Sequence, residues 1–270
     1  MAEIEAWRTQ REARLVADGG WLTVAGLFWL KEGENRFGSA NDNDIVLPAS
    51  APEHAGVFDF HGGSVRARIE AGVTATVGAK PVTVVDMHPD TSGSPETLTM
   101  GPLSMHVIER GDRYGIRLKD NESPARKAFK GLQWFPVSDA YRVTARFVPY
   151  SPPRSIPIPN VLGQVNEMPS PGYVVLTLGG EELRLDPVLE EPDAEELFVI
   201  FRDGTTGKET YGAGRFLYTE KPRDGRVVLD FNKAYSPPCA FTPYATCPLP
   251  PKQNRLSVRI EAGEKSDGAH

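Results

Sequence analysis

The chain has 270 residues, of which 40% are hydrophobic and 24% charged, and its formal net charge at pH 7 is -6. A chain of this length can bury a substantial core as one large or two smaller β domains, and its composition is ordinary for a soluble globular protein. The net acidity argues against a nucleic-acid partner, because binding to phosphates needs a basic face.

The longest apolar run, Trp21–Leu30, is shorter than the ~20 residues that a membrane-spanning helix requires. The first residues also lack a basic segment followed by an apolar core, so we expect no secretory signal. These features predict a cytoplasmic protein without membrane contact. In a reducing cytoplasm, Cys239 and Cys247 are expected to be thiols and not a structural disulfide.

The residue pattern predicts a mainly β protein that begins with one helix. Residues 3–18 are expected to be helical, because acidic residues open the segment, apolar residues fall near one face, and Gly19-Gly20 ends it. Beyond it, Gly and Pro separate short runs, several of which alternate apolar and polar residues as antiparallel strands do. Strands are expected at 45–47, 64–70, 74–78, 103–110, 114–120, 141–150, 172–179, 182–189, 197–203, 210–220, 226–232 and 256–262.

We expect four regions along the chain. Residues 1–30 hold the helix and an apolar segment, 31–148 a first β region, 149–265 an antiparallel β-barrel or sandwich with a proline-rich cover, and 266–270 a frayed tail. Residues 149–159 are rich in proline and mark the central boundary. They could be a stiff connector or an edge segment that crosses between sheets, since proline allows both.

Three segments carry a family resemblance: GWLTVAGLFWLKEGENRFGS (20–39), FRDGTTGKETYGAGRFL (201–217) and the C-terminal DFNKAYSPPCAFTPYATCPLPPKQNRLSVRIEAGEK (230–265). Together they resemble an uncharacterised prokaryotic family, domain of unknown function 1684. The resemblance implies one coherent unit, but it implies no activity, catalytic residue or cofactor.

The first half is similar to forkhead-associated domains, in the segments GENRFGSANDNDIVLP, APEHAGVF and GVTATVGAKPV. That resemblance implies a β-sandwich, and the family binds phosphothreonine through a Gly-Arg pair, a Ser-x-x-His element and an Asn-Gly pair. Here Ser39 replaces the arginine, Ser50 lies one residue too far from His54, and Val77-Gly78 replaces Asn-Gly. Loss of the arginine removes a bidentate phosphate donor.

The two cysteines are eight residues apart, a spacing that matches neither a zinc site nor a redox motif, so we predict no metal. Cys239 could be a nucleophile if a nearby imidazolium, from His54 or His106, lowered its pKa. The alternative is that both cysteines are small apolar packing groups.

A polar set in the second half predicts a binding site. Gly212 and Gly214 interrupt the strand between Tyr211 and Arg215, which is typical of a bulge or of close approach by a ligand or second backbone. Tyr211 and Arg215 can share one face, and an inward arginine needs a carboxylate, either internal or from a ligand.

Asp230 and Asn232 share a strand face and could complete the inner polar set around Arg215. Alternatively, Asp230 pairs with Arg215 and Asn232 caps the backbone of the following loop. These two structural roles are common for Asp and Asn near turns.

Residues 230–251, the proline-rich cover, are too apolar and aromatic for a solvated loop and should pack over the C-terminal sheet. The cover could simply seal the core or could form a pocket with a few convergent polar groups. We predict that the pocket binds a small molecule, anionic if Arg215 anchors it, oriented by Asp230 and Asn232 and walled by Tyr211 and Tyr235.

Two other functions remain open. The first β region could be a protein-interaction module that contacts a partner through loops around Ser39, Asn41, Asn43 and His54. The chain could also be a cysteine-dependent hydrolase with Cys239 as nucleophile.

Overall fold

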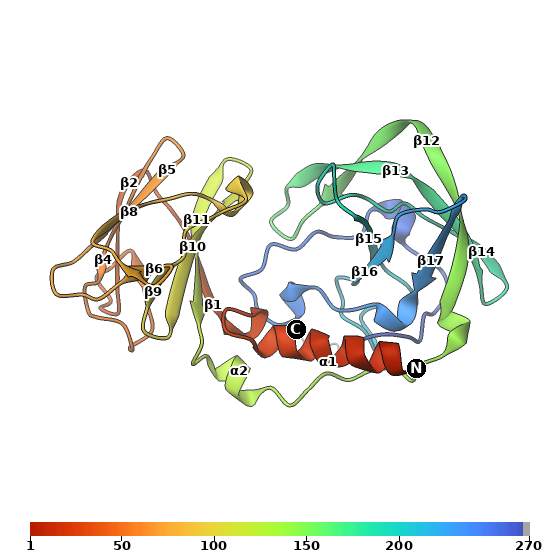
Figure 1. Cartoon of the computed structure of the whole chain (residues 1–270), viewed down its shortest axis with the longest axis horizontal. Helices are drawn as coiled ribbons and strands as arrows, with labels where there is room; N and C mark the ends of the chain where they lie inside the picture. Colours follow the sequence, from red (N-terminus) through yellow and green to blue (C-terminus); the bar gives the residue numbers. More distant parts are fainter. Residues whose placement is uncertain (267–270) are drawn as a thin grey trace. The chain divides into compact units, whose positions relative to one another are not determined.

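The computed structural model describes residues 1–266. Of the expected tail, 266–270, all but the first residue lies outside the described residues. The chain divides into two compact units (Figure 1). Arg14–Phe129 forms the N-terminal unit, and Met1–Ala13 together with Lys130–His270 forms the C-terminal unit.

The N-terminal unit is a sandwich of short strands, with 3-10 turns at η1 (Trp21–Thr23) and η2 (Asp90–Ser92) and a short helix α2 (Pro124–Ala128). Its strands are β1 (Val24–Trp29), β2 (Gly33–Gly38), β3 (Ile45–Val46), β4 (Gly56–His61), β5 (Ser64–Ile69), β6 (Thr76–Val77), β7 (Lys80–Pro81), β8 (Val84–Met87), β9 (Leu98–Met100), β10 (Leu103–Arg110) and β11 (Arg113–Asp120).

These strands form a six-stranded sheet, β1-β11-β10-β9-β6-β7, and a five-stranded sheet, β3-β2-β4-β5-β8. Both sheets contribute to one apolar core, which includes Phe37 and Phe58 from one sheet and Leu103 and Ile116 from the other. The rings of Phe37 and Phe58 stack with centroids 4.4 Å apart. Each sheet therefore buries one face against the other.

Up to residue 266, the C-terminal unit contains residues 2–13 of the helix α1 (Ala2–Val16) and six strands. These are β12 (Arg142–Pro159), β13 (Val165–Leu178), β14 (Glu181–Leu185), β15 (Glu196–Phe201), β16 (Arg215–Glu220) and β17 (Arg226–Asp230). Short 3-10 turns lie at η3 (Asp139–Tyr141), η4 (Phe231–Lys233), η5 (Pro238–Ala240) and η6 (Lys252–Asn254).

Four of these strands form the sheet β14-β13-β12-β17, and β15 pairs with β16 in a two-stranded ribbon. Leu176, Leu185 and Leu229 from the sheet and Leu197 and Leu217 from the ribbon meet in a second apolar core. Among residues 1–266 no sheet closes on itself, so the sandwich, and not the barrel, describes this unit.

The proline-rich residues 149–159 are strand residues of β12. Pro149 and residues 154–159 pair with β13, and the register shifts between Pro149 and Arg154. The other neighbour, β17, pairs only with residues 142–146 of β12. Proline has no backbone N–H, and an edge with an interrupted register tolerates it.

The helix α1 docks onto residues 132–135 of the C-terminal unit through polar side chains. The guanidinium of Arg8 donates to the carbonyl oxygen of Phe135 (2.9 Å) and lies 4.8 Å from the ring centroid of Trp134. A carboxylate oxygen of Glu12 accepts from the amide of Leu132 (3.1 Å). These contacts join the start of the chain to residues 132–135.

The prediction of a mainly β protein with an N-terminal helix and antiparallel sheets is confirmed. One predicted strand, 256–262, is not a strand. Its backbone instead bonds to the end of β15: the Leu256 amide donates to the Arg202 oxygen (2.8 Å) and the Gly204 amide to the Val258 oxygen (2.7 Å). None of the helices within residues 1–266 has both the length and the apolar character needed to cross a membrane.

Candidate functional site

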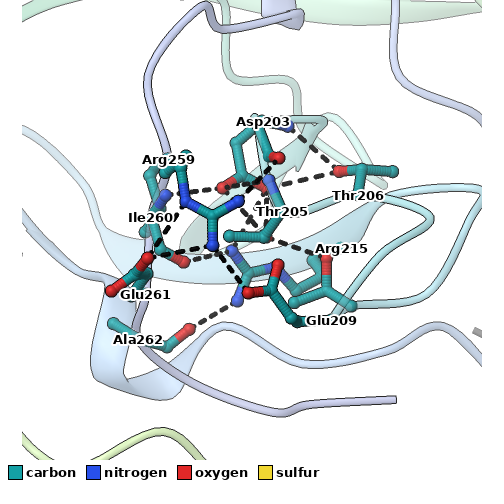
Figure 2. Close-up of polar contacts among 11 residues, drawn as sticks. Asp203, Thr205, Thr206, Glu209, Arg215, Arg259, Ile260, Glu261 and Ala262 are labelled. Atoms are coloured by element: carbon teal, nitrogen blue, oxygen red, sulfur yellow. Dashed lines mark hydrogen bonds and ion pairs between the residues drawn. The ribbon is translucent and has the colours of Figure 1, made fainter. Parts of the chain in front are cut away.

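Arg215 is fully buried and its guanidinium is bound by groups of the protein itself (Figure 2). It lies 3.3 Å from a carboxylate oxygen of Asp203 and also donates to the carbonyl oxygens of Ala262 and of Ile260, the latter at 2.9 Å. The Asp203 carboxylate in turn accepts from the Thr205 hydroxyl (2.9 Å) and the Ile260 amide (2.6 Å). The positive charge of Arg215 is therefore compensated inside the core.

The strand register explains this pair. Arg215 pairs with Phe201 at the end of the β15–β16 ribbon, and Asp203 follows two residues later. Burial lowers the pKa of Arg215, and the nearby Asp203 carboxylate opposes that shift. The internal partner is thus Asp203 and not Asp230. At Gly214, with a φ of 105°, an added Cβ would lie 2.5 Å from the Phe201 oxygen, so this glycine allows a second backbone to approach closely.

Asp230 and Asn232 are buried at the end of β17 and hold a neighbouring turn. The Asn232 side chain accepts from the Ser138 amide (3.0 Å) and donates to the Ser138 oxygen (2.9 Å) and to Asp230 (2.9 Å). Asp230 lies 3.4 Å from the guanidinium of Arg142, whose side chain is 52% exposed. Asn232 thus caps backbone groups of Ser138 and not of the following loop, and Asp230 pairs with Arg142 and not with Arg215.

Tyr211 lies against the proline-rich cover. Its hydroxyl donates to the carbonyl oxygen of Cys239 (3.1 Å), and burial raises the pKa of the Tyr211 phenol. The Cys239 amide donates to the sulfur of Cys247 (3.2 Å), so the two cysteines lie side by side as thiols. Arg215, Tyr211 and Asp230 therefore have three separate sets of partners and do not converge on one site.

Tyr235 belongs to a row of four partly buried aromatic rings. Trp134 and Trp7 meet edge to face with ring centroids 5.8 Å apart, Trp7 lies 6.2 Å from Tyr235, and Tyr235 stacks on Tyr218 at 6.3 Å. We call these four residues the aromatic row. Each of them keeps part of its surface exposed.

A phenol paired with a carboxylate ends the aromatic row. The Tyr218 hydroxyl donates to a carboxylate oxygen of the exposed Glu190 (2.6 Å). Burial raises the pKa of the Tyr218 and Tyr235 phenols well above 10, and the carboxylate of Glu190 adds to the shift at Tyr218. Both tyrosines therefore keep their protons, and their donor capacity, across the physiological pH range.

Arg11 and Glu264 flank the aromatic row. The Arg11 guanidinium lies 4.6 Å from the ring centroid of Tyr235, donates to the Ser236 oxygen (2.8 Å) and lies 3.4 Å from the Glu264 carboxylate. Burial raises the pKa of Glu264, and Arg11 opposes the shift. This ion pair holds the helix α1 against the row.

The sequence interpretation found Tyr235 but missed its neighbours. Trp7 lies within the predicted helix 3–18, and Glu190 lies outside every predicted strand and site. One signal was available for Tyr218: it follows Phe216 by two residues, so both lie on the face of the ribbon opposite Arg215. Among residues 1–266 no group of three or more His, Cys, Asp or Glu side chains is arranged to hold a metal ion.

Comparison with known proteins gives limited similarity. No curated protein matches the chain. An uncharacterised protein of Haloarcula marismortui, solved by NMR, is 35% identical, with 54% of this chain and 81% of that chain covered and a TM-score of 0.46. The FHA-2 domain of the Mycobacterium tuberculosis ABC transporter Rv1747 is 24% identical, with 33% and 77% covered and a TM-score of 0.25.

The family comparison is more extensive. A family model described as "Protein of unknown function (DUF1684)" matches residues 127–265, which are 139 of the 270 residues. The match includes the segments 201–217 and 230–265, whereas 20–39 lies outside it. The chain belongs to this family.

Proposed function

We propose that the C-terminal unit binds a small molecule on the aromatic row, beside the Tyr218–Glu190 hydrogen bond. The observation that carries this proposal is the unbroken contact of four partly exposed rings, from Trp134 through Trp7 and Tyr235 to Tyr218. Aromatic side chains that stay partly exposed give a large apolar contact area at low entropic cost, with a polar atom at the edge.

The polar groups of the row indicate which chemistry would fit. Glu190 is an exposed acceptor, and the two phenols remain protonated donors and acceptors. Phe198 and Tyr235 both stack on the Tyr218 ring, and the Arg11 guanidinium lies over the Tyr235 ring. A ligand would therefore contact the exposed ring edges while its hydroxyl or ammonium donors reach Glu190. We therefore propose a neutral or cationic ligand with an apolar surface.

The charge balance argues against an anionic ligand held by Arg215. Asp203 already neutralises Arg215, and Glu264 lies beside Arg11. An anion at either arginine would have to compete with a buried carboxylate, which costs desolvation without a new charge partner. Of the residues predicted from sequence, the proposed site uses Tyr235, while Tyr211 lies at the cover.

Native mass spectrometry of the purified protein tests the proposal first, because a retained small molecule would be seen directly. A thermal-shift screen of flat heterocycles, aromatic amines and sugars follows, with affinities measured by calorimetry. We expect Tyr235→Ala to weaken a binding compound about 10-fold, equivalent to ~1.4 kcal/mol, through loss of an apolar contact with the ring.

Tyr218→Phe removes only the hydroxyl that contacts Glu190 and should weaken the same compound several-fold in a folded protein. The matched control is Tyr244→Ala, since Tyr244 is an exposed tyrosine of the same cover. Equal affinity in the Tyr235, Tyr218 and Tyr244 variants, or a protein that neither retains nor binds any compound, would reject the aromatic row as a binding site.

A further inference from the structure

The outer face of the four-stranded sheet is rich in arginine. Val174, Leu176 and Leu185 point into the core. Because side chains alternate along a strand, the residues next to them in sequence point outward. The outward residues include four exposed arginines and two partly buried tyrosines. We call this set the arginine face: Arg146, Arg154, Arg184, Arg226, Tyr150 and Tyr173.

Two of these arginines oppose each other directly. Arg146 of β12 pairs with Arg226 of β17. On its other side Arg146 pairs with Val175 of β13, which in turn pairs with Arg184 of β14. Like charges directly opposite each other destabilise a sheet. Neither Arg146 nor Arg226 forms an ion pair with any carboxylate among residues 1–266.

The other half of the face is a stack of rings and guanidinium groups. Arg154 lies 4.4 Å from the ring centroid of Tyr150, the rings of Tyr150 and Tyr173 are 5.6 Å apart, and Arg184 lies 3.9 Å from the Tyr173 centroid. Stacking on an aromatic face positions a guanidinium. The edge of Arg154 forms no ion pair with any of the described residues. That of Arg184 already donates to Asp186 and to the Tyr150 hydroxyl.

The positive charge of the face exceeds its local compensation. Asp186 pairs with Arg184 at 3.0 Å, and Glu182 is exposed on the same side of β14. The other three arginines have no ion pair within the described chain, although the whole protein has a net charge of -6. A repulsive arginine pair on an acidic protein is explained if a negatively charged partner covers it.

We propose that the arginine face binds an acidic segment of a partner protein. A guanidinium fork matches a carboxylate with two parallel hydrogen bonds, and Arg with Tyr is the composition of energetically dominant interface residues. Strands lie about 4.8 Å apart, so Arg226, Arg146 and Arg184 span three strand spacings, roughly 14 Å. An extended segment of about four or five residues covers that length at about 3.3 Å per residue.

Fluorescence anisotropy with a labelled octaglutamate peptide tests the proposal at low and at physiological salt, with octalysine as the control for the sign of charge. We expect the parent protein to bind octaglutamate and not octalysine, with weaker binding as salt rises. Arg146→Glu combined with Arg226→Glu should weaken binding at least about 10-fold. Arg146→Lys combined with Arg226→Lys keeps the charge but loses the fork, and should weaken it less.

The matched control is Arg36→Glu combined with Arg66→Glu, which changes the net charge equally at exposed arginines of β2 and β5. Equal loss in this control, or no octaglutamate binding by the parent, would overturn the proposal. Tighter binding of a short oligonucleotide than of octaglutamate would instead assign the face to nucleic acid. If sedimentation shows a dimer that dissociates in the Arg146→Glu/Arg226→Glu variant, the arginine face would be assigned to contact with a second copy of the chain. If that variant does not fold, the single change Arg226→Gln replaces it.

Discussion

The guanidinium of Arg215 lies 3.3 Å from the carboxylate of Asp203, and both side chains are fully buried. Removing one partner would leave the other charge in the core without compensation. We therefore expect Arg215→Ala to lower the free energy of unfolding by ~3–5 kcal/mol, measured by urea denaturation. Arg142→Ala, at a pair in which the arginine is 52% exposed, should cost about 1 kcal/mol or less.

A double replacement separates a missing charge partner from lost packing. Arg215→Met combined with Asp203→Leu removes both charges, and should be more stable than Arg215→Ala alone, because no isolated charge remains. If Arg215→Ala is as stable as the parent, Arg215 does not depend on Asp203. A ligand role for Arg215 would then regain support.

The requirement for this pair could be predicted, although the partner could not. An arginine on an inward strand face needs a carboxylate, which follows from desolvation alone. Asp203 begins a turn in which its carboxylate accepts from the hydroxyls of Thr205 and Thr206, and this local role is enough to account for an aspartate there. Only the register of Phe201 with Arg215 shows that the same carboxylate also faces the guanidinium.

The aromatic row could not be predicted from sequence, because it assembles residues from opposite ends of the chain. Trp7 meets both Trp134 and Tyr235. Beside the row, Arg11 contacts Ser236, 225 positions away, and Glu264, 253 positions away. Residue periodicity and turn residues are local signals, and from them the helix and most of the strands could be predicted. They carry no information on which distant segment a helix will meet. The segment 256–262 also alternates like a strand, yet it runs beside residues 202–204 outside any sheet.

His106 should make the stability of the N-terminal unit depend on pH. Burial lowers the pKa of His106 from 6.5 to about 4, and the positive charges of Lys119 and Arg117 add to the shift. Between pH 6.5 and about 4 the unfolded chain binds more protons than the folded one, so stability falls as pH decreases through this range. The full effect is about 3 kcal/mol.

His106→Gln should flatten this part of the pH profile, measured as the free energy of unfolding in urea at several pH values. His54→Gln is the control, since the His54 side chain is 58% exposed. A His106→Gln variant that keeps the parent's slope between pH 4 and 6.5 would show that His106 does not control it.

The two cysteines should differ in reactivity. Cys239 is partly exposed, whereas Cys247 is 5% exposed and its sulfur accepts the Cys239 amide. With iodoacetamide at neutral pH, followed by mass spectrometry, we expect Cys239 to be modified first, and both at the same rate in urea. Cys239→Ser should remove the fast phase. A faster reaction at Cys247 would mean that the cover opens in solution, and two inert thiols in the folded protein would dismiss the cysteine-hydrolase hypothesis.

The direct opposition of Arg146 and Arg226 should reduce stability in a salt-dependent way. Arg146→Thr relieves the repulsion, and we expect it to raise the free energy of unfolding at low salt by ~0.2–1 kcal/mol. Added salt screens exposed charges, so the gain should shrink as salt increases. Arg66→Thr is the control of opposite sign, because Arg66 bonds to Asp86 at 2.6 Å and its loss removes an attraction. A native charged residue that makes the protein less stable than an uncharged replacement would is typical of a surface retained for binding. If Arg146→Thr instead destabilises the protein, or if its effect does not change with salt, the pair is not repulsive and the charge argument for the arginine face fails.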